Sequence, residues 1–66
     1  MVAIEILKTI EQNPRITPLE MSKKLGINLQ YIRNTLRTLT ELKLVETPAR
    51  GVYVLTELGR YILKQI

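Results

Sequence analysis

Apolar residues recur along most of this chain at the spacing of an α-helix, except in two short runs between residues 44 and 55. The first helical pattern, over residues 2–12, places four apolar side chains on one face: Val2, Ala3, Ile6 and Ile10. This helix should end at Asn13, because the residue before a proline avoids the helical conformation. Residues 15–17 then look short and extended, and we expect them to form one rung of a small sheet.

The next segment predicts two helices joined by a tight turn. Thr17 can cap the first helix, Pro18 suits its first turn, and Glu20 completes a capping box. The helix should end before Gly26, which favours the left-handed conformation at a helix end. Asn28 can cap a second helix over about residues 29–42. The apolar face of that second helix consists of Leu29, Ile32, Leu36 and Leu39.

The two β-favouring runs, residues 44–46 and 52–55, predict a hairpin because a five-residue loop containing Gly51 separates them. Pro48 belongs at the edge or in the turn, since it has no N–H for a central strand. Thr56 can cap a last helix, whose inner face we expect to carry Leu58, Ile62 and Ile66. The predicted fold is mainly α with a small β-hairpin (α+β), in the order α-β-α-α-β-β-α, as one domain over residues 1–66.

The two central helices have the features of a helix-turn-helix. Helices that cross closely need a small residue on the first, a glycine in the turn and a branched aliphatic on the second. Ser22, Gly26 and Ile32 meet these demands. The shared core would be completed by four further apolar residues: Leu19, Leu25, Ile27 and Leu36.

Three stretches of the chain resemble the winged-helix family, particularly the compact bacterial and archaeal regulators of the MarR, ArsR and PadR types. They are residues 19–27 (LEMSKKLGI), 32–45 (IRNTLRTLTELKLV) and 53–60 (YVLTELGR). The resemblance implies a winged helix-turn-helix that binds double-stranded DNA sequence-specifically and regulates transcription as a repressor. Helix 29–42 would enter the major groove, and the wing, residues 44–55, would contact the backbone or minor groove. Lys43 stands where the family often has Gly, so either its backbone is unusual or the helix ends differently.

The positive charge supports this interpretation, because it is concentrated on the motif. The chain has a formal charge of +4, and residues 23–50 hold six Lys or Arg residues against two Glu residues. Opposite the apolar face of helix 29–42 lie Gln30, Arg33, Asn34 and Arg37. Arginine suits guanine and the two amides suit adenine. The alternative is an ordinary solvent-facing side, although this side carries no acid before Glu41.

By resemblance, the first half of this helix enters the groove, with Asn28, Gln30, Tyr31, Arg33 and Asn34, while Arg37 and Thr38 lie nearer the DNA backbone. Tyr31 would either contact sugar and phosphate or cover the edge of the core. Arg50 at the hairpin tip is a candidate minor-groove or phosphate contact. Lys23 and Lys24 would touch phosphates or only favour their own helix dipole, and Arg15 could also reach the DNA backbone.

The first and last helices carry more apolar residues than one core face requires. The surplus residues are Ile4, Leu7, Tyr61 and Leu63. A chain this short builds a marginal core, and such chains often associate. We therefore expect a homodimer through these two helices, which is also what the resemblance implies. The alternative is a wide apolar stripe that wraps a small core.

Composition excludes several other classes. The chain lacks Cys, His and Asp, so we expect no enzyme, metal site or cofactor. No apolar run is long enough for a membrane span, and no small-molecule ligand is expected in so little volume. Two alternatives stay open: a winged-helix module that binds protein within a transcription or assembly complex, and a sequence-neutral DNA-coating protein. A DNA regulator of this type is expected in the cytoplasm, at the nucleoid.

Overall fold

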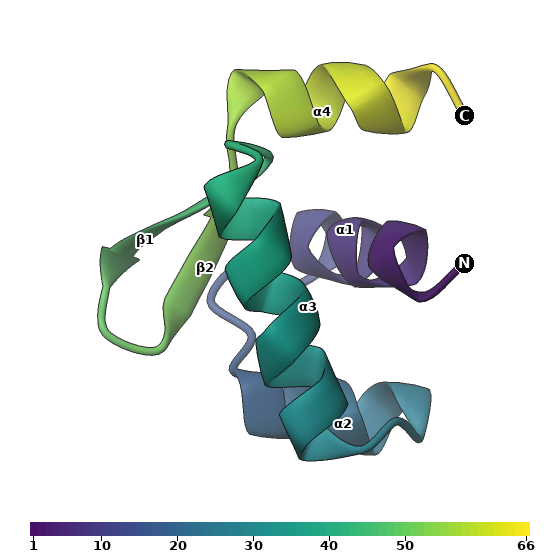
Figure 1. Cartoon of the computed structure of the whole chain (residues 1–66), viewed down its shortest axis with the longest axis vertical. Helices are drawn as coiled ribbons and strands as arrows, with labels where there is room; N and C mark the ends of the chain where they lie inside the picture. The colour runs from purple at the N-terminus through teal and green to yellow at the C-terminus, as the bar shows by residue number, and fades with distance from the viewer.

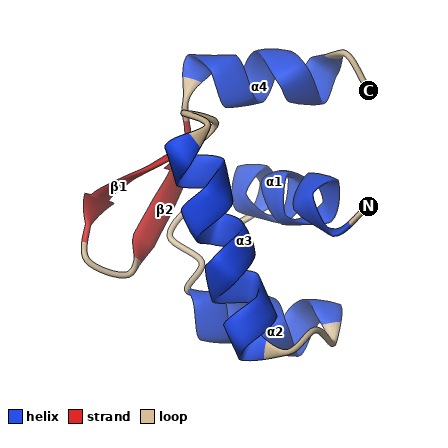
Figure 2. Ribbon diagram, viewed as in Figure 1, coloured by secondary structure: helices blue, strands red, loops and turns tan.

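The computed structural model describes all residues, 1–66, and contains four helices and one hairpin (Figures 1 and 2). In chain order these are α1 (Val2–Gln12), α2 (Pro18–Leu25), α3 (Leu29–Glu41), β1 (Val45–Ala49), β2 (Val52–Leu55) and α4 (Glu57–Lys64). The hairpin lies on one side of α3, and both chain ends lie on the other side (Figure 1). None of the helices is long and apolar enough to cross a bilayer.

The helix starts follow the predicted caps. The Thr17 hydroxyl accepts from the Glu20 N–H, and the Glu20 carboxylate accepts from the Thr17 N–H at 2.9 Å, which completes the capping box. The Asn28 side chain caps α3, and the Thr56 hydroxyl caps α4 by accepting from the Gly59 N–H at 3.0 Å. These interactions are local in sequence, which is why the pattern predicted them.

Ten buried apolar residues form one core under α3. They come from α1, the α1–α2 connection, α2, α3 and both strands: Ile6, Leu7, Ile10, Ile16, Met21, Ile32, Leu36, Leu39, Val45 and Leu55. The last helix contributes Leu63, which is partly buried and packs against this cluster. The core therefore holds α3 by one face and leaves its other face to solvent.

The predicted strand at residues 15–17 is wrong. Arg15 adopts a left-handed conformation with φ of 71°, and the Ile16 N–H donates to the Asn13 carbonyl at 3.1 Å, so the chain turns there instead of extending. The turn directs Ile16 into the core, where it is buried. The sheet has only β1 and β2, and the order is α-α-α-β-β-α.

The hairpin is tighter than predicted, because β1 continues through Pro48 to Ala49 and leaves Arg50 and Gly51 as the turn. The strands are antiparallel, and Glu46 pairs with Val54 whereas Ala49 pairs with Val52. Two residues of β1 thus oppose one residue of β2, which is a β-bulge. Pro48 sits at this bulge, where a missing N–H is tolerated, so its predicted place at an edge is confirmed.

The predicted inner face of α4 is wrong for two of its three residues, since only Ile62 is half-buried. Ile66 is 64% exposed and Leu58 is exposed too, whereas Gly59 is buried. A Cβ at Gly59 would lie 3.1 Å from the carbonyl carbon of Leu44 and closer still to its oxygen. The absence of a side chain at Gly59 lets α4 approach the backbone of Leu44, in the connection between α3 and β1, and Leu63, one turn later, packs against the core. Leu19, predicted to be in the shared core, is likewise half exposed.

Lys43 has the unusual backbone that its place in the sequence suggested. Its φ is 66°. The Leu44 N–H donates to the Leu39 carbonyl and the Lys43 N–H donates to the Thr40 carbonyl, each at 3.0 Å. This is the Schellman arrangement that normally places glycine at the left-handed position. The Thr56 hydroxyl also donates to the Lys43 carbonyl at 2.6 Å, so the end of α3 is tied to the start of α4.

Candidate nucleic-acid interface

The outer face of α3 is open and basic. Ile32, Leu36 and Leu39 are buried on its inner side. On the outer side four predicted contact residues are exposed: Gln30, Arg33, Asn34 and Arg37. The guanidinium groups therefore lie on the face that the core leaves free. An α-helix with such a face fits the width of the DNA major groove.

Hydrogen bonds on this face divide its polar groups into two kinds. The hydroxyls of Thr35 and Thr38 donate to backbone carbonyls of α3 itself, those of Tyr31 and Asn34. In contrast, the side chains of Gln30 and Asn34 bond to each other, with the Gln30 Nε2 donating to the Asn34 Oδ1 at 3.1 Å. This pairing was missed in the sequence, although a spacing of four on a helix could have suggested it.

Arg33 and Arg37 also line a groove between α3 and the hairpin. Its lining comes from α2, α3 and both sides of the wing: Pro18, Arg33, Arg37, Thr40, Glu41, Thr47, Gly51 and Tyr53. The sequence analysis did not identify Thr47 and Tyr53 as groove residues. A bulge changes which side of the hairpin each side chain faces, so the alternation of residues does not predict it. The groove places two guanidinium groups opposite the wing. A polyanion strand lying there would meet two cations on the α3 wall, with the carboxylate of Glu41 on the same wall.

At the wing tip, Arg50 is exposed in the two-residue turn. The turn between β1 and β2 is the end of the hairpin that lies away from α4 (Figure 1). The tip therefore extends the basic surface beyond α3.

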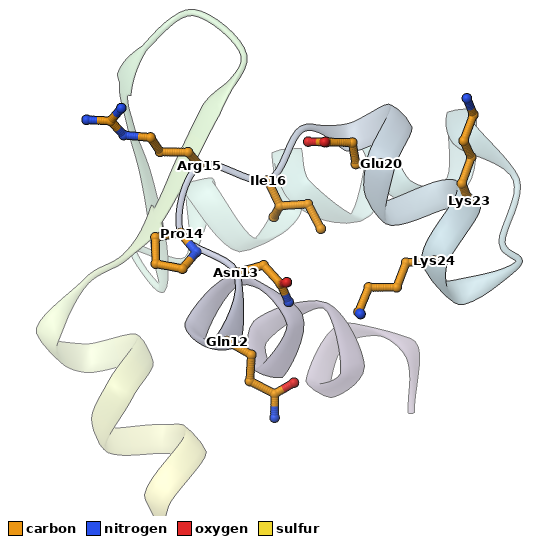
Figure 3. A pocket seen from close by; sticks show the side chains of 8 residues that line it. All are labelled: Gln12, Asn13, Pro14, Arg15, Ile16, Glu20, Lys23 and Lys24. Carbon is orange, nitrogen blue, oxygen red and sulfur yellow. The ribbon is translucent and has the colours of Figure 1, made fainter.

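Arg15, Lys23 and Lys24 border a second hollow, between the end of α1 and α2. In Figure 3 their side chains point in different directions, with Arg15 turned away from both lysines. Glu20 lies on the same rim, and the pKa of its carboxyl is lowered because the Thr17 backbone N–H donates to it. The three cations do not converge on one point, so they suit an extended polyanion more than a single bound ion.

Two other predicted contact residues of α3 have different surroundings. The Asn28 side-chain oxygen already accepts from the Gln30 and Tyr31 N–H groups, at 2.8 and 3.3 Å. Its structural role is therefore the helix cap, and its NH₂ group remains for another partner. Tyr31 is 54% exposed, so the ring does not serve mainly as a cover for the core.

The outer helices present a different apolar surface from the one predicted. Leu7 is only 2% exposed and belongs to the core, so it offers no surface to another chain. Leu63 is partly buried against the same core, and Ile4 is half-buried. Tyr61 is 60% exposed, as the prediction required. Leu58 on α4 and Ile66 just after it add exposed apolar area that the sequence analysis had assigned to the interior.

Comparisons with known proteins agree with this architecture. A family model described as winged helix-turn-helix DNA-binding matches residues 3–46. A crystal structure of the reduced form of MarR from E. coli superposes with a TM-score of 0.89 at 28% identity, over 97% of this chain and 48% of that one. A crystal structure of IdeR from T. acidophilum shares the fold, with a TM-score of 0.80 at 23% identity, over 96% of this chain and 30% of that one.

The chain therefore spans about half the length of the MarR chain that it matches. No curated protein sequence matches it. The matched residues run from α1 to the start of the wing and include the whole helix-turn-helix. By this match and by its fold, the chain belongs to the winged helix-turn-helix DNA-binding family.

Proposed function

We propose that this chain is a sequence-specific regulator of transcription that binds double-stranded DNA and represses by occluding the promoter. In this proposal α3 enters the major groove, and the wing formed by β1 and β2 lies on the backbone or in the minor groove. The observation that carries the proposal is the exposure of Arg33 and Arg37, opposite the buried face of α3 and beside the wing. Such a regulator would act in the cytoplasm, at the nucleoid.

The two kinds of contact would have different consequences. Cations at Lys23, Lys24 and Arg50 would neutralise phosphates and release counterions, which gives affinity that falls with salt. Base edges in the major groove would be read by Arg33 and its neighbours on α3. Specificity would therefore depend on α3, and affinity on the whole basic surface.

A band-shift titration tests the assigned surface. The double variant Arg33→Ala/Arg37→Ala should lose affinity and sequence preference, and its salt dependence should decrease by about one counterion for each phosphate that is no longer neutralised. The matched control Lys8→Ala/Lys64→Ala removes two charges from α1 and α4, and should keep the sequence preference. Wild-type affinity and preference in the arginine variant would refute the assignment. Binding that ignores competitor sequence would indicate a sequence-neutral DNA-coating protein instead.

The same proposal includes a symmetric homodimer through α1 and α4. These helices contact each other and lie on the side of α3 away from the wing (Figure 1). The apolar groups available there are the half-buried Ile4 and the exposed Leu58, Tyr61 and Ile66. A two-fold arrangement would place two copies of α3 in successive major grooves, about 34 Å apart. Sedimentation that shows only a monomer at micromolar concentration, with and without DNA, would refute it.

The exposed apolar surface of α4 also favours a second candidate, a module that binds another protein within a transcription or assembly complex. In that case the basic face of α3 would be incidental. Recovery of a stoichiometric protein partner, together with no retention on DNA at moderate salt, would support this candidate. If the Tyr61→Ser variant no longer recovered this partner, the contact would lie on α4.

A further inference from the structure

The hydrogen bond between Gln30 and Asn34 joins the only two carboxamides on the outer face of α3. Both side chains are exposed and one helical turn apart. A bond between exposed side chains competes with water and adds little to folding. Its main effect is geometric, because it favours one orientation of each amide group relative to the other in the free protein.

The bond leaves a defined set of free groups. A primary amide has two N–H donors and one acceptor oxygen. Because Gln30 donates to Asn34, the Gln30 Oε1 stays free as an acceptor and the Asn34 NH₂ stays free as a donor. If both amides were turned over, Asn34 would donate to Gln30, and the free acceptor and donor would exchange places. In either arrangement one residue keeps an unshared amide oxygen as an acceptor, and the other keeps an unshared NH₂ group as a donor.

This pattern is complementary to adenine. In the major groove adenine displays a donor, N6–H₂, next to an acceptor, N7, whereas guanine displays two acceptors. We infer that Gln30 and Asn34 act as one paired reader of an adenine in an A·T base pair. The inference rests on the proposed function, and it names the base that this part of α3 recognises. Arg33 and Arg37 only donate, so they suit guanine at neighbouring positions.

The start of α3 holds the pair in place. The Asn28 side chain accepts from the Gln30 N–H at 2.8 Å, which fixes the backbone of Gln30 at the first turn. Asn34 lies in the middle of the helix, four residues later, and its own carbonyl accepts from the Thr38 hydroxyl. Both side chains are therefore attached to ordered backbone, so only their own rotamers remain to be fixed when a partner binds.

The inference is tested by selecting bound duplexes from a random pool with the wild-type protein and with Gln30→Ala, Asn34→Ala and the double variant. The wild type should enrich an A·T base pair. Each single variant should lose about tenfold in preference at that same position, the scale of one bidentate contact. The double variant should lose little more than either single variant, because one unit is removed in each case. Gln65→Ala, an exposed amide on another element, should change nothing.

The outcomes separate this inference from the proposed function. Loss of preference at two separate base pairs, with effects that multiply in the double variant, would overturn the paired reader. So would unchanged A·T preference in all three variants, and both results would leave salt-dependent, sequence-specific DNA binding intact. Absence of DNA binding by the wild-type protein would overturn both proposals. Circular dichroism should show the wild-type helix content in every variant, since both side chains are exposed.

Discussion

Replacing Gly59 with alanine tests the packing that positions α4. The added Cβ would meet the Leu44 carbonyl, with 3.1 Å to its carbon and less to its oxygen. This carbonyl belongs to backbone and already accepts from the Thr56 N–H at 3.1 Å. The start of α4 must therefore move away from the Leu44 backbone, and the hydrogen bond from Thr56 to Leu44 must weaken.

The expected loss of stability is the balance of three contributions. Overpacking against a rigid neighbour costs about 1–3 kcal/mol. Weakening of the hydrogen bond from the Thr56 N–H to the Leu44 carbonyl adds about 1 kcal/mol. Alanine is a better helix former than glycine by about 1 kcal/mol, which offsets the second contribution. The net loss is about 2 kcal/mol in the free energy of unfolding, which lowers Tm by roughly 8–16 °C in a domain of this size.

Thermal unfolding followed by circular dichroism measures this loss. Gly26→Ala is the matched control, because no atom lies within 4 Å of its added Cβ and only its φ of 67° is unfavourable. The control should lose about 1 kcal/mol, the scale of a left-handed alanine. If Gly59→Ala were as stable as the wild type or more stable than the control, the close approach of α4 to the Leu44 backbone would be refuted.

Three further predictions follow from other positions. Lys43→Gly should raise the free energy of unfolding by about 0.5–1 kcal/mol in urea titrations, since glycine adopts the left-handed conformation without strain; a loss of stability would contradict this. Leu7→Ala should lower the free energy of unfolding by about 2–5 kcal/mol at any protein concentration, because Leu7 lies in the core of one chain. A loss that depends on protein concentration would indicate instead that Leu7 lies in a dimer interface. Glu20→Ala should destabilise at pH 7 and less at pH 3, since the lowered pKa of Glu20 means that its stabilisation disappears as the carboxyl is protonated. An equal difference at both pH values would show that ionised Glu20 does not contribute.

Local signals in the sequence predicted the helices well. Thr17, Asn28 and Thr56 each act through the next three residues, and such contacts can be read from a short window. The apolar face of α3 was also correct, because three of its four apolar residues are buried and the fourth, Leu29, is half-buried. This single pattern placed Arg33 and Arg37 on the open side.

The errors occurred where distant parts of the chain decide the outcome. Five apolar residues in and after α4 surround much of the helix, so periodicity alone could not choose its inner side. The inner side of α4 is determined by Gly59, because only a residue without a side chain allows the helix to contact the Leu44 backbone. At Arg15 a left-handed turn replaced the expected strand, since nothing in the three residues 15–17 distinguishes the two conformations. Which wing residues face Arg33 and Arg37 depends on a bulge that the alternation of side chains does not reveal.

The bulge at Thr47 and Pro48 has a consequence for how copies of this protein meet. A two-stranded sheet has two open edges, and a long regular edge invites strands from other molecules to add to it. On β1 the irregular register and the proline interrupt the row of N–H groups that an incoming strand would need. The β1 edge of the wing is thereby protected from pairing with strands of other molecules at high local concentration.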